Sequence, residues 1–334
     1  MLNTQKLHPE LANWLRGVNE QVKLQGDSAA TRITPEFMRK SLARMTEAFV
    51  TDAPAVARVS DTVLKNRQVA VPLRIYDPAP GTEKPVTLFL HGGGHMCGSI
   101  QVYDPICRKL ANASGQLVVA PDYRLAPEFP YPAALEDCYA VIKHLWSHLD
   151  NAGALFTPSL SLVGDSGGGA LCATLSTISQ RDPSLPIEKQ ALIYPSLDYT
   201  LSSPSVDALA HGYLLEKSRI QWYFDHYFQA DECRLSASPL FMPASSQYPA
   251  TLMVTAGFCP LRDEGSRYFN RLRNVGVATH HHVEPAMIHA YLNLEDLVPK
   301  ACARTYEAIA GFVNSTQSGS TSPRVSNPST LSKL

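Results

Sequence analysis

The sequence lacks long apolar runs, closely spaced cysteines and a surplus of either charge. No run of about 18 apolar residues occurs, so we expect no membrane span. The opening residues also lack the apolar core of a signal peptide. The seven cysteines are scattered and never spaced C-x-x-C, which argues against a disulfide framework and a structural zinc site. Basic (29) and acidic (30) residues are interspersed, so no basic stripe is available for nucleic acid. These absences predict a cytoplasmic protein.

The remaining composition is that of a packed globular protein. Of the 334 residues, 45% are hydrophobic and 18% are charged. Short, mostly continuous apolar runs indicate strands that are covered on both faces. Helical patterns lie before and between them, and this alternation predicts an α/β fold with a mainly parallel sheet. The predicted strands are 69–76, 86–90, 117–120, 160–163, 191–194 and 252–255, and the predicted helices are 9–24, 35–50, 132–149, 167–180, 263–275 and 300–313.

One segment, residues 196–238, interrupts the alternation. It contains no predicted strand, and its aromatic residues recur at helical spacing. It is either a buried helix or a cap over an active-site mouth. We take it as a cap insertion to which the helices of residues 1–55 contribute. The catalytic domain is then 56–195 together with 239–315, and the tail 316–334, rich in serine, threonine and proline, is predicted to be disordered.

The strongest local motif is LSLVGDSGGGALC, in which an apolar strand leads into G-x-S-x-G and then into small helical residues. This is the nucleophile-elbow pattern in the strand–turn–helix setting that it requires. The serine occupies a strained turn, and glycines keep bulk away where strand and helix crowd together. The motif therefore indicates Ser166 as a nucleophile.

The second motif is HGGG at positions 91–94, directly after the predicted strand 86–90. Acyl transfer needs backbone N–H groups aimed at the carbonyl oxygen as it becomes anionic, and glycine lets the backbone approach closely. We assign the oxyanion hole to the amides of Gly93, Gly94 and Gly167. His91 is interpreted as a structural hydrogen-bonding residue rather than a base.

HGGG, then YRLAPE, then GDSGGG, in that order, resemble the hormone-sensitive-lipase-like family of bacterial esterases, from about Val59 to Phe312. TLMVTAGFCPLRDEG resembles the acid loop of that family and AMIHAYLNL its histidine loop. The resemblance implies an α/β-hydrolase fold, with a mostly parallel central sheet flanked by helices and a helical cap. It implies a Ser–Asp–His triad in which His289 is the base, neither metal nor organic cofactor, and a monomer or homodimer.

The acid loop departs from the family pattern, because Cys259 stands where the family usually has the triad aspartate. A thiol is mostly neutral at neutral pH and poorly suited to stabilising a charged imidazole. Asp263, the acid that we favour, could reach His289 instead, and so could Glu264. Otherwise Ser166 and His289 form a weakened dyad, or catalysis is lost. Both acids would equally suit the N-terminus of a helix.

The motifs together predict a carboxylesterase that acts on a small-molecule ester through a serine acyl-enzyme. A compact pocket under aromatic helices favours short to medium acyl chains, and we expect Met96, Tyr213, Leu214 and Trp222 to line it. One rival is a small-molecule binding protein on the same scaffold, since plant gibberellin receptors resemble this family and have an incomplete triad. Amide or lactone hydrolysis is another alternative, which the sequence does not separate from ester hydrolysis.

Overall fold

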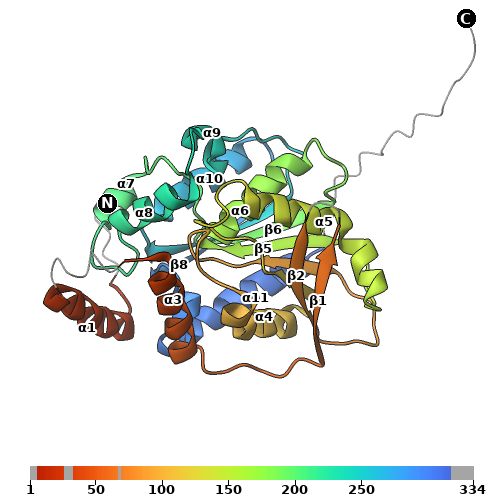
Figure 1. Ribbon diagram of the computed structural model, residues 1–334, viewed down its shortest axis with the longest axis horizontal. Coiled ribbons are helices and arrows are strands. Elements are labelled where there is room, and N and C mark those ends of the chain that lie inside the picture. The colour runs from red at the N-terminus through yellow and green to blue at the C-terminus, as the bar shows by residue number, and fades with distance from the viewer. Residues whose placement is uncertain (1–5, 26–32, 67–68, 317–334) are drawn as a thin grey trace, which may run out of the picture.

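The computed structural model describes residues 6–25, 33–66 and 69–316, which form one layered α/β structure (Figure 1). The tail predicted to be disordered lies outside the described residues from position 317 onward. No helix in the described ranges is long and apolar enough to cross a membrane.

In the described chain, eight strands form one sheet in the order β1-β2-β4-β3-β5-β6-β7-β8. β2 is antiparallel to both of its neighbours, β1 and β4, and the other neighbours pair in parallel. The strands are β1 (Arg58–Lys65), β2 (Ala70–Asp77), β3 (Val86–Leu90), β4 (Leu117–Pro121), β5 (Leu160–Asp165), β6 (Ile187–Ile193), β7 (Ala250–Phe258) and β8 (Thr279–Ile288). β3, β4 and β5 are buried along their whole length, as their continuous apolar runs predicted.

Helices cover both faces of this sheet, and each face has its own apolar core (Figure 1). One core contains residues of α4 and α11, and the other contains residues of α5, α6 and α10. Side chains alternate across a strand, so each central strand contributes to both cores. The helices are α1 (Pro9–Gln25), α3 (Pro35–Phe49), α4 (Ile100–Ser114), α5 (Ala133–Asn151), α6 (Ser166–Ser179), α7 (Pro204–Ala208), α8 (Lys217–Tyr227), α9 (Arg234–Ala237), α10 (Arg262–Asn274) and α11 (Pro299–Asn314), with short 3-10 helices η1 (Pro239–Phe241) and η2 (Tyr291–Leu297).

The strand register brings the motif-bearing loops together. Leu90, at the end of β3, pairs with Gly164 near the end of β5. Phe258, at the end of β7, pairs with Ile288 at the end of β8. Because the carboxyl ends of parallel strands lie along one edge of the sheet, the segments that follow them meet there.

The segment between β6 and β7 contains α7, α8 and α9, and the N-terminal helices contact it or the loops beside it. Asn19 of α1 donates a hydrogen bond to the carbonyl of Gly212 over 3.1 Å. Arg39 of α3 donates to the carbonyls of Met96 and Ala126 over 2.9 and 2.8 Å. These contacts support the contribution of the N-terminal helices to the cap, while the division of the chain into domains stays a prediction.

Candidate active site

Ser166 lies at the junction where β5 ends and α6 begins, and its backbone is left-handed, with φ of 51°. A non-glycine residue pays about 1–3 kcal/mol for such a conformation, so the surroundings must enforce it. The neighbouring glycines allow the crowding. A Cβ on Gly164 would lie 2.6 Å from the backbone of Gly168, and a Cβ on Gly168 would lie 1.9 Å from the carbonyl oxygen of Leu90. Strand, turn and helix can therefore approach this closely only with glycine at both positions.

The predicted oxyanion loop lies against this turn. Gly93 and Gly94 both have positive φ, 120° and 63°, and both line the same pocket as Ser166. A Cβ built on Gly167 would lie 3.4 Å from the amide nitrogen of Gly94, so the three predicted glycines converge beside the nucleophile. Backbone amides gathered in this way suit an oxygen that becomes negatively charged.

Asp165 holds the loop to the elbow. One carboxyl oxygen accepts the Gly92 N–H over 2.6 Å, and the other accepts the Tyr103 hydroxyl over 3.1 Å. Burial raises the pKa of Asp165 to about 7. His91 stacks on the rings of Tyr103 and Tyr123, at centroid distances of 5.4 and 4.3 Å. The side chains of Asp165 and His91 thus help to hold the HGGG loop in place.

The structure brings Ser166, His289 and Cys259 into one hydrogen-bonded relay. His289 Nε2 lies 2.9 Å from Ser166 Oγ, and His289 Nδ1 lies 3.2 Å from Cys259 Sγ. The Leu261 N–H donates to the same sulfur over 3.3 Å. Cys259 and His289 directly follow the paired residues Phe258 and Ile288, so the register of β7 and β8 sets this contact.

Burial favours the neutral forms of both His289 and Cys259. It lowers the pKa of His289 to about 3, because the charged imidazolium loses its hydration. It also raises the pKa of the Cys259 thiol above its ordinary value. At neutral pH the relay is therefore a hydroxyl, a neutral imidazole and a neutral thiol.

Neither Asp263 nor Glu264 is hydrogen-bonded to His289 in the described chain. The Asp263 carboxylate pairs with Arg262 over 2.8 Å. Glu264 turns toward the loop after β6, where its carboxyl accepts the N–H groups of Leu197 and Asp198 over 2.6 and 3.3 Å. Both acids lie in the first turn of α10, and that turn directs their side chains away from the histidine. Cys259 thus occupies the place beside His289 that the sequence analysis assigned to Asp263.

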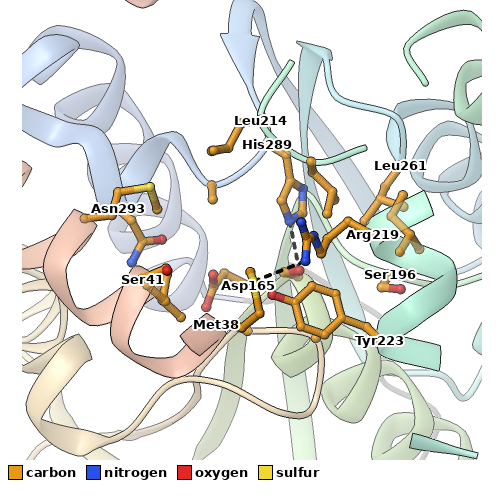
Figure 2. Close-up of a pocket in the computed structure, with 18 of the residues that line it drawn as sticks. Met38, Ser41, Asp165, Ser196, Leu214, Arg219, Tyr223, Leu261, His289 and Asn293 are labelled. Carbon is orange, nitrogen blue, oxygen red and sulfur yellow. Dashed lines mark hydrogen bonds between the residues drawn. The ribbon is translucent and has the colours of Figure 1, made fainter. Parts of the chain in front are cut away.

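A cavity of about 290 Å³ opens over Ser166 and His289, and α3, α8 and the loop before α8 form its walls (Figure 2). Leu214 lines it as predicted, but Met96, Tyr213 and Trp222 do not. Met96 is completely buried in the core. Tyr213 packs on Phe258, with ring centroids 5.5 Å apart.

Trp222 directly precedes Tyr223 on α8, and the residues of α8 that face the cavity are Arg219, Ile220, Tyr223 and Phe224. One residue rotates a helix by about 100°, and Trp222 therefore packs on His226 instead, with ring centroids 4.2 Å apart. The period of this aromatic stripe could have identified Tyr223 from the sequence. The α3 wall, including Met38 and Leu42, depends on long-range packing that no local pattern indicates.

A family model described as the alpha/beta hydrolase fold matches residues 87–293. The chain belongs to this family. The hydrolase is 35% identical over 266 residues to the carboxylic ester hydrolase LipN of Mycobacterium tuberculosis, a match that covers 76% of this chain and 69% of LipN. It is 33% identical over 251 residues to the ethyl acetate hydrolase of Pseudomonas putida, covering 73% of this chain and 78% of that protein.

Solved structures lead to the same family. The ester-hydrolase EH1AB1 from the metagenome of Lake Arreo has a TM-score of 0.84 and 31% sequence identity, and the match covers 92% of this chain and 98% of that one. The α/β-hydrolase fold and the esterase family that the motifs predicted are confirmed.

Within the described ranges, no group of three or more histidine, cysteine, aspartate or glutamate residues is placed to hold a metal ion.

The close approach at the elbow predicts a stability difference between two glycine substitutions. Gly168→Ala would force a Cβ against the Leu90 carbonyl, and we expect it to lower the free energy of unfolding by at least about 2 kcal/mol. Gly311→Ala, in α11 where a Cβ meets nothing, should raise it by about 0.5–1 kcal/mol. Urea titration of the hydrolase measures both. Equal stability of the two variants would contradict the tight elbow.

Proposed function

We propose that this carboxylic ester hydrolase cleaves short- to medium-chain esters through an acyl-enzyme on Ser166, with His289 as base and the neutral Cys259 thiol in place of the usual triad acid. The observation that carries the proposal is the 2.9 Å contact between Ser166 Oγ and His289 Nε2 beside the glycine amides. The named relatives, a carboxylic ester hydrolase and an ethyl acetate hydrolase, support the same substrate class.

The mechanism follows from which nitrogen of His289 carries the proton. Nε2 must be unprotonated to accept the proton of Ser166, so Nδ1 carries the hydrogen and donates it to Cys259 Sγ. Ser166 Oγ then attacks the ester carbonyl, and the oxyanion lies near the amides of Gly93, Gly94 and Gly167. His289 returns the proton to the leaving alcohol. Water, activated by the same nitrogen, finally releases the acid.

The thiol of Cys259 performs one half of the task of a triad carboxylate. As a hydrogen-bond acceptor for Nδ1–H it orients the ring and is compatible with the tautomer that leaves Nε2 free. It carries no charge to offset the imidazolium that forms as Ser166 attacks. Loss of the acid function lowers turnover about 10⁴-fold in a triad where the tautomer is also wrong. Because an acceptor for Nδ1–H is still present here, we expect a smaller loss.

The cavity supports small substrates. Its volume of about 290 Å³ suits an ester with a short or medium acyl chain, and apolar side chains such as Leu214, Ile220 and Phe224 form much of its wall.

All seven cysteines are free, which supports a cytoplasmic location. We keep a monomer or homodimer as the proposed assembly.

The proposal predicts a chain-length profile. Initial rates on p-nitrophenyl acetate, butyrate, octanoate and palmitate should give the highest kcat/KM among the three shorter esters and the lowest for palmitate. Ser166→Ala should lower turnover by at least about 10³-fold, because the nucleophile is gone. Wild-type rates equal to those of Ser166→Ala would contradict ester hydrolysis and favour a binding role for the cavity.

The positions of Asp263 and Cys259 predict which of the two matters for turnover. Asp263→Asn removes a partly exposed ion pair with Arg262 and should change kcat by less than about 3-fold. His289→Gln, which breaks the relay, serves as the comparison and should resemble Ser166→Ala. If Asp263→Asn lost as much activity as His289→Gln, Asp263 would be the triad acid in solution.

Cys259→Asp should restore the missing charge. The new carboxylate would meet the Leu261 N–H and His289 Nδ1, so we expect kcat to rise at least about 10-fold, with about 10⁴-fold as a ceiling. A carboxylate also stabilises the imidazolium and raises the pKa of His289 from its depressed value of about 3. The acidic limb of the kcat/KM profile should therefore move to higher pH.

Asp165 is present in both proteins, so the difference between the two profiles reports the coupled titration of His289 and the new carboxyl group. An unchanged rate and an unchanged acidic limb would mean that another acid already serves the histidine.

A further inference from the structure

The cavity over Ser166 contains an arginine that pairs with no carboxylate of the described chain. Arg219 lies in the first turn of α8, and its side chain extends into the pocket toward Met38 of α3 (Figure 2). Its Nη1 lies 3.3 Å from the Met38 sulfur, and its guanidinium carbon lies 5.9 Å from the centre of the Trp222 ring. None of the ion pairs between described residues includes Arg219.

Other arginines of the described chain are paired with carboxylates. Arg39 contacts Glu128, Arg234 contacts Asp225 and Arg262 contacts Asp263, over 2.5 to 2.8 Å. Among the described residues that line the cavity, Asp165 alone carries a carboxyl group, and both of its oxygens are engaged by the Gly92 N–H and the Tyr103 hydroxyl. The positive charge of Arg219 is thus left without a counter-charge inside a mostly apolar pocket.

The contacts of Arg219 position it without using its hydrogen-bonding capacity. A thioether sulfur is a weak acceptor, and a ring face attracts the cation without accepting in-plane N–H bonds. Most of the five guanidinium N–H donors therefore have no acceptor among the described residues. A planar guanidinium matches a carboxylate through two parallel hydrogen bonds, which strengthen when water is partly excluded.

A plain alkyl ester would offer the guanidinium of Arg219 no anionic partner in the cavity. The pocket is thus better matched to a substrate that carries an anionic group beside the ester.

We propose that Arg219 determines specificity by binding a carboxylate of the substrate, so that the preferred substrates are esters whose acyl or alcohol part carries a carboxylate group. This inference rests on the proposed ester hydrolysis at Ser166. It assigns to Arg219 a role in recognition and none in the proton transfers, which belong to His289.

The test compares esters that differ in charge and little in shape. One pair is monoethyl glutarate and its neutral amide analogue ethyl 4-carbamoylbutanoate, which places the charge on the acyl side. The other pair is 4-carboxyphenyl butyrate and 4-carbamoylphenyl butyrate, which places it on the alcohol side. We measure kcat/KM at about pH 8, where the carboxyl groups are ionised. The wild type should prefer the anionic member of at least one pair by at least about 10-fold.

Variants then attribute the preference to Arg219. Arg219→Gln should remove it, and Arg219→Lys should retain part of it, because an ammonium keeps the charge without the paired donors. Lys217→Gln is the matched control, since it removes a positive charge two positions away on α8 that pairs with Asp207 instead of facing the cavity. This control should keep the wild-type ratio.

The outcomes separate this inference from the proposed function. Hydrolysis of the neutral esters with no preference for either anionic ester would overturn the inference and leave the esterase proposal standing. An equal fall for both members of a pair in Arg219→Gln would also overturn it, because the arginine would then serve every ester alike. Failure of the wild type to cleave any of the four esters would overturn the proposed function itself.

Discussion

The geometry of the site depends on the strained backbone of Ser166, where β5 turns into α6 within a single residue. The left-handed conformation directs the serine hydroxyl toward the edge of the sheet where the loops after β3, β7 and β8 meet. It is tolerated because Gly164 and Gly168 let strand, turn and the β3 backbone crowd together. The buried parallel strands on both sides supply the free energy that maintains the strain. The positions of the oxyanion loop and His289 relative to the nucleophile all follow from this packing.

A triad acid has two tasks, to orient the histidine and to stabilise its charged form, and the contacts of Cys259 suit the first of them. A hydrogen-bond acceptor at Nδ1 favours the tautomer that leaves Nε2 free, and the sulfur of Cys259 lies 3.2 Å from that nitrogen. Stabilising the charged ring requires a negative charge, which a buried thiol with a raised pKa does not provide. Among the described residues that line the cavity, Arg219 supplies the cationic side chain.

The sequence predicted those features that depend on a local pattern of residues. Continuous apolar runs located the buried strands, and GDSGG and HGGG identified the elbow and the loop because each needs glycine at fixed spacing. The contact between Cys259 and His289 depends on the register of β7 and β8, which no local pattern contains. The acids Asp263 and Glu264 were placed near the right loop, but the first turn of α10 directs them elsewhere.

The most direct test of the relay is the protonation state of His289. NMR of protein labelled with nitrogen-15 in the histidine rings reports it, and the His289→Gln variant assigns the signals. We expect a neutral ring with its hydrogen on Nδ1 throughout the range from about pH 5 to 8, where an ordinary histidine would titrate. A doubly protonated His289 in this range would contradict it, because the partner would then be a charged thiolate or another acid. A hydrogen on Nε2 would contradict it as well, since that nitrogen could not accept the proton of Ser166.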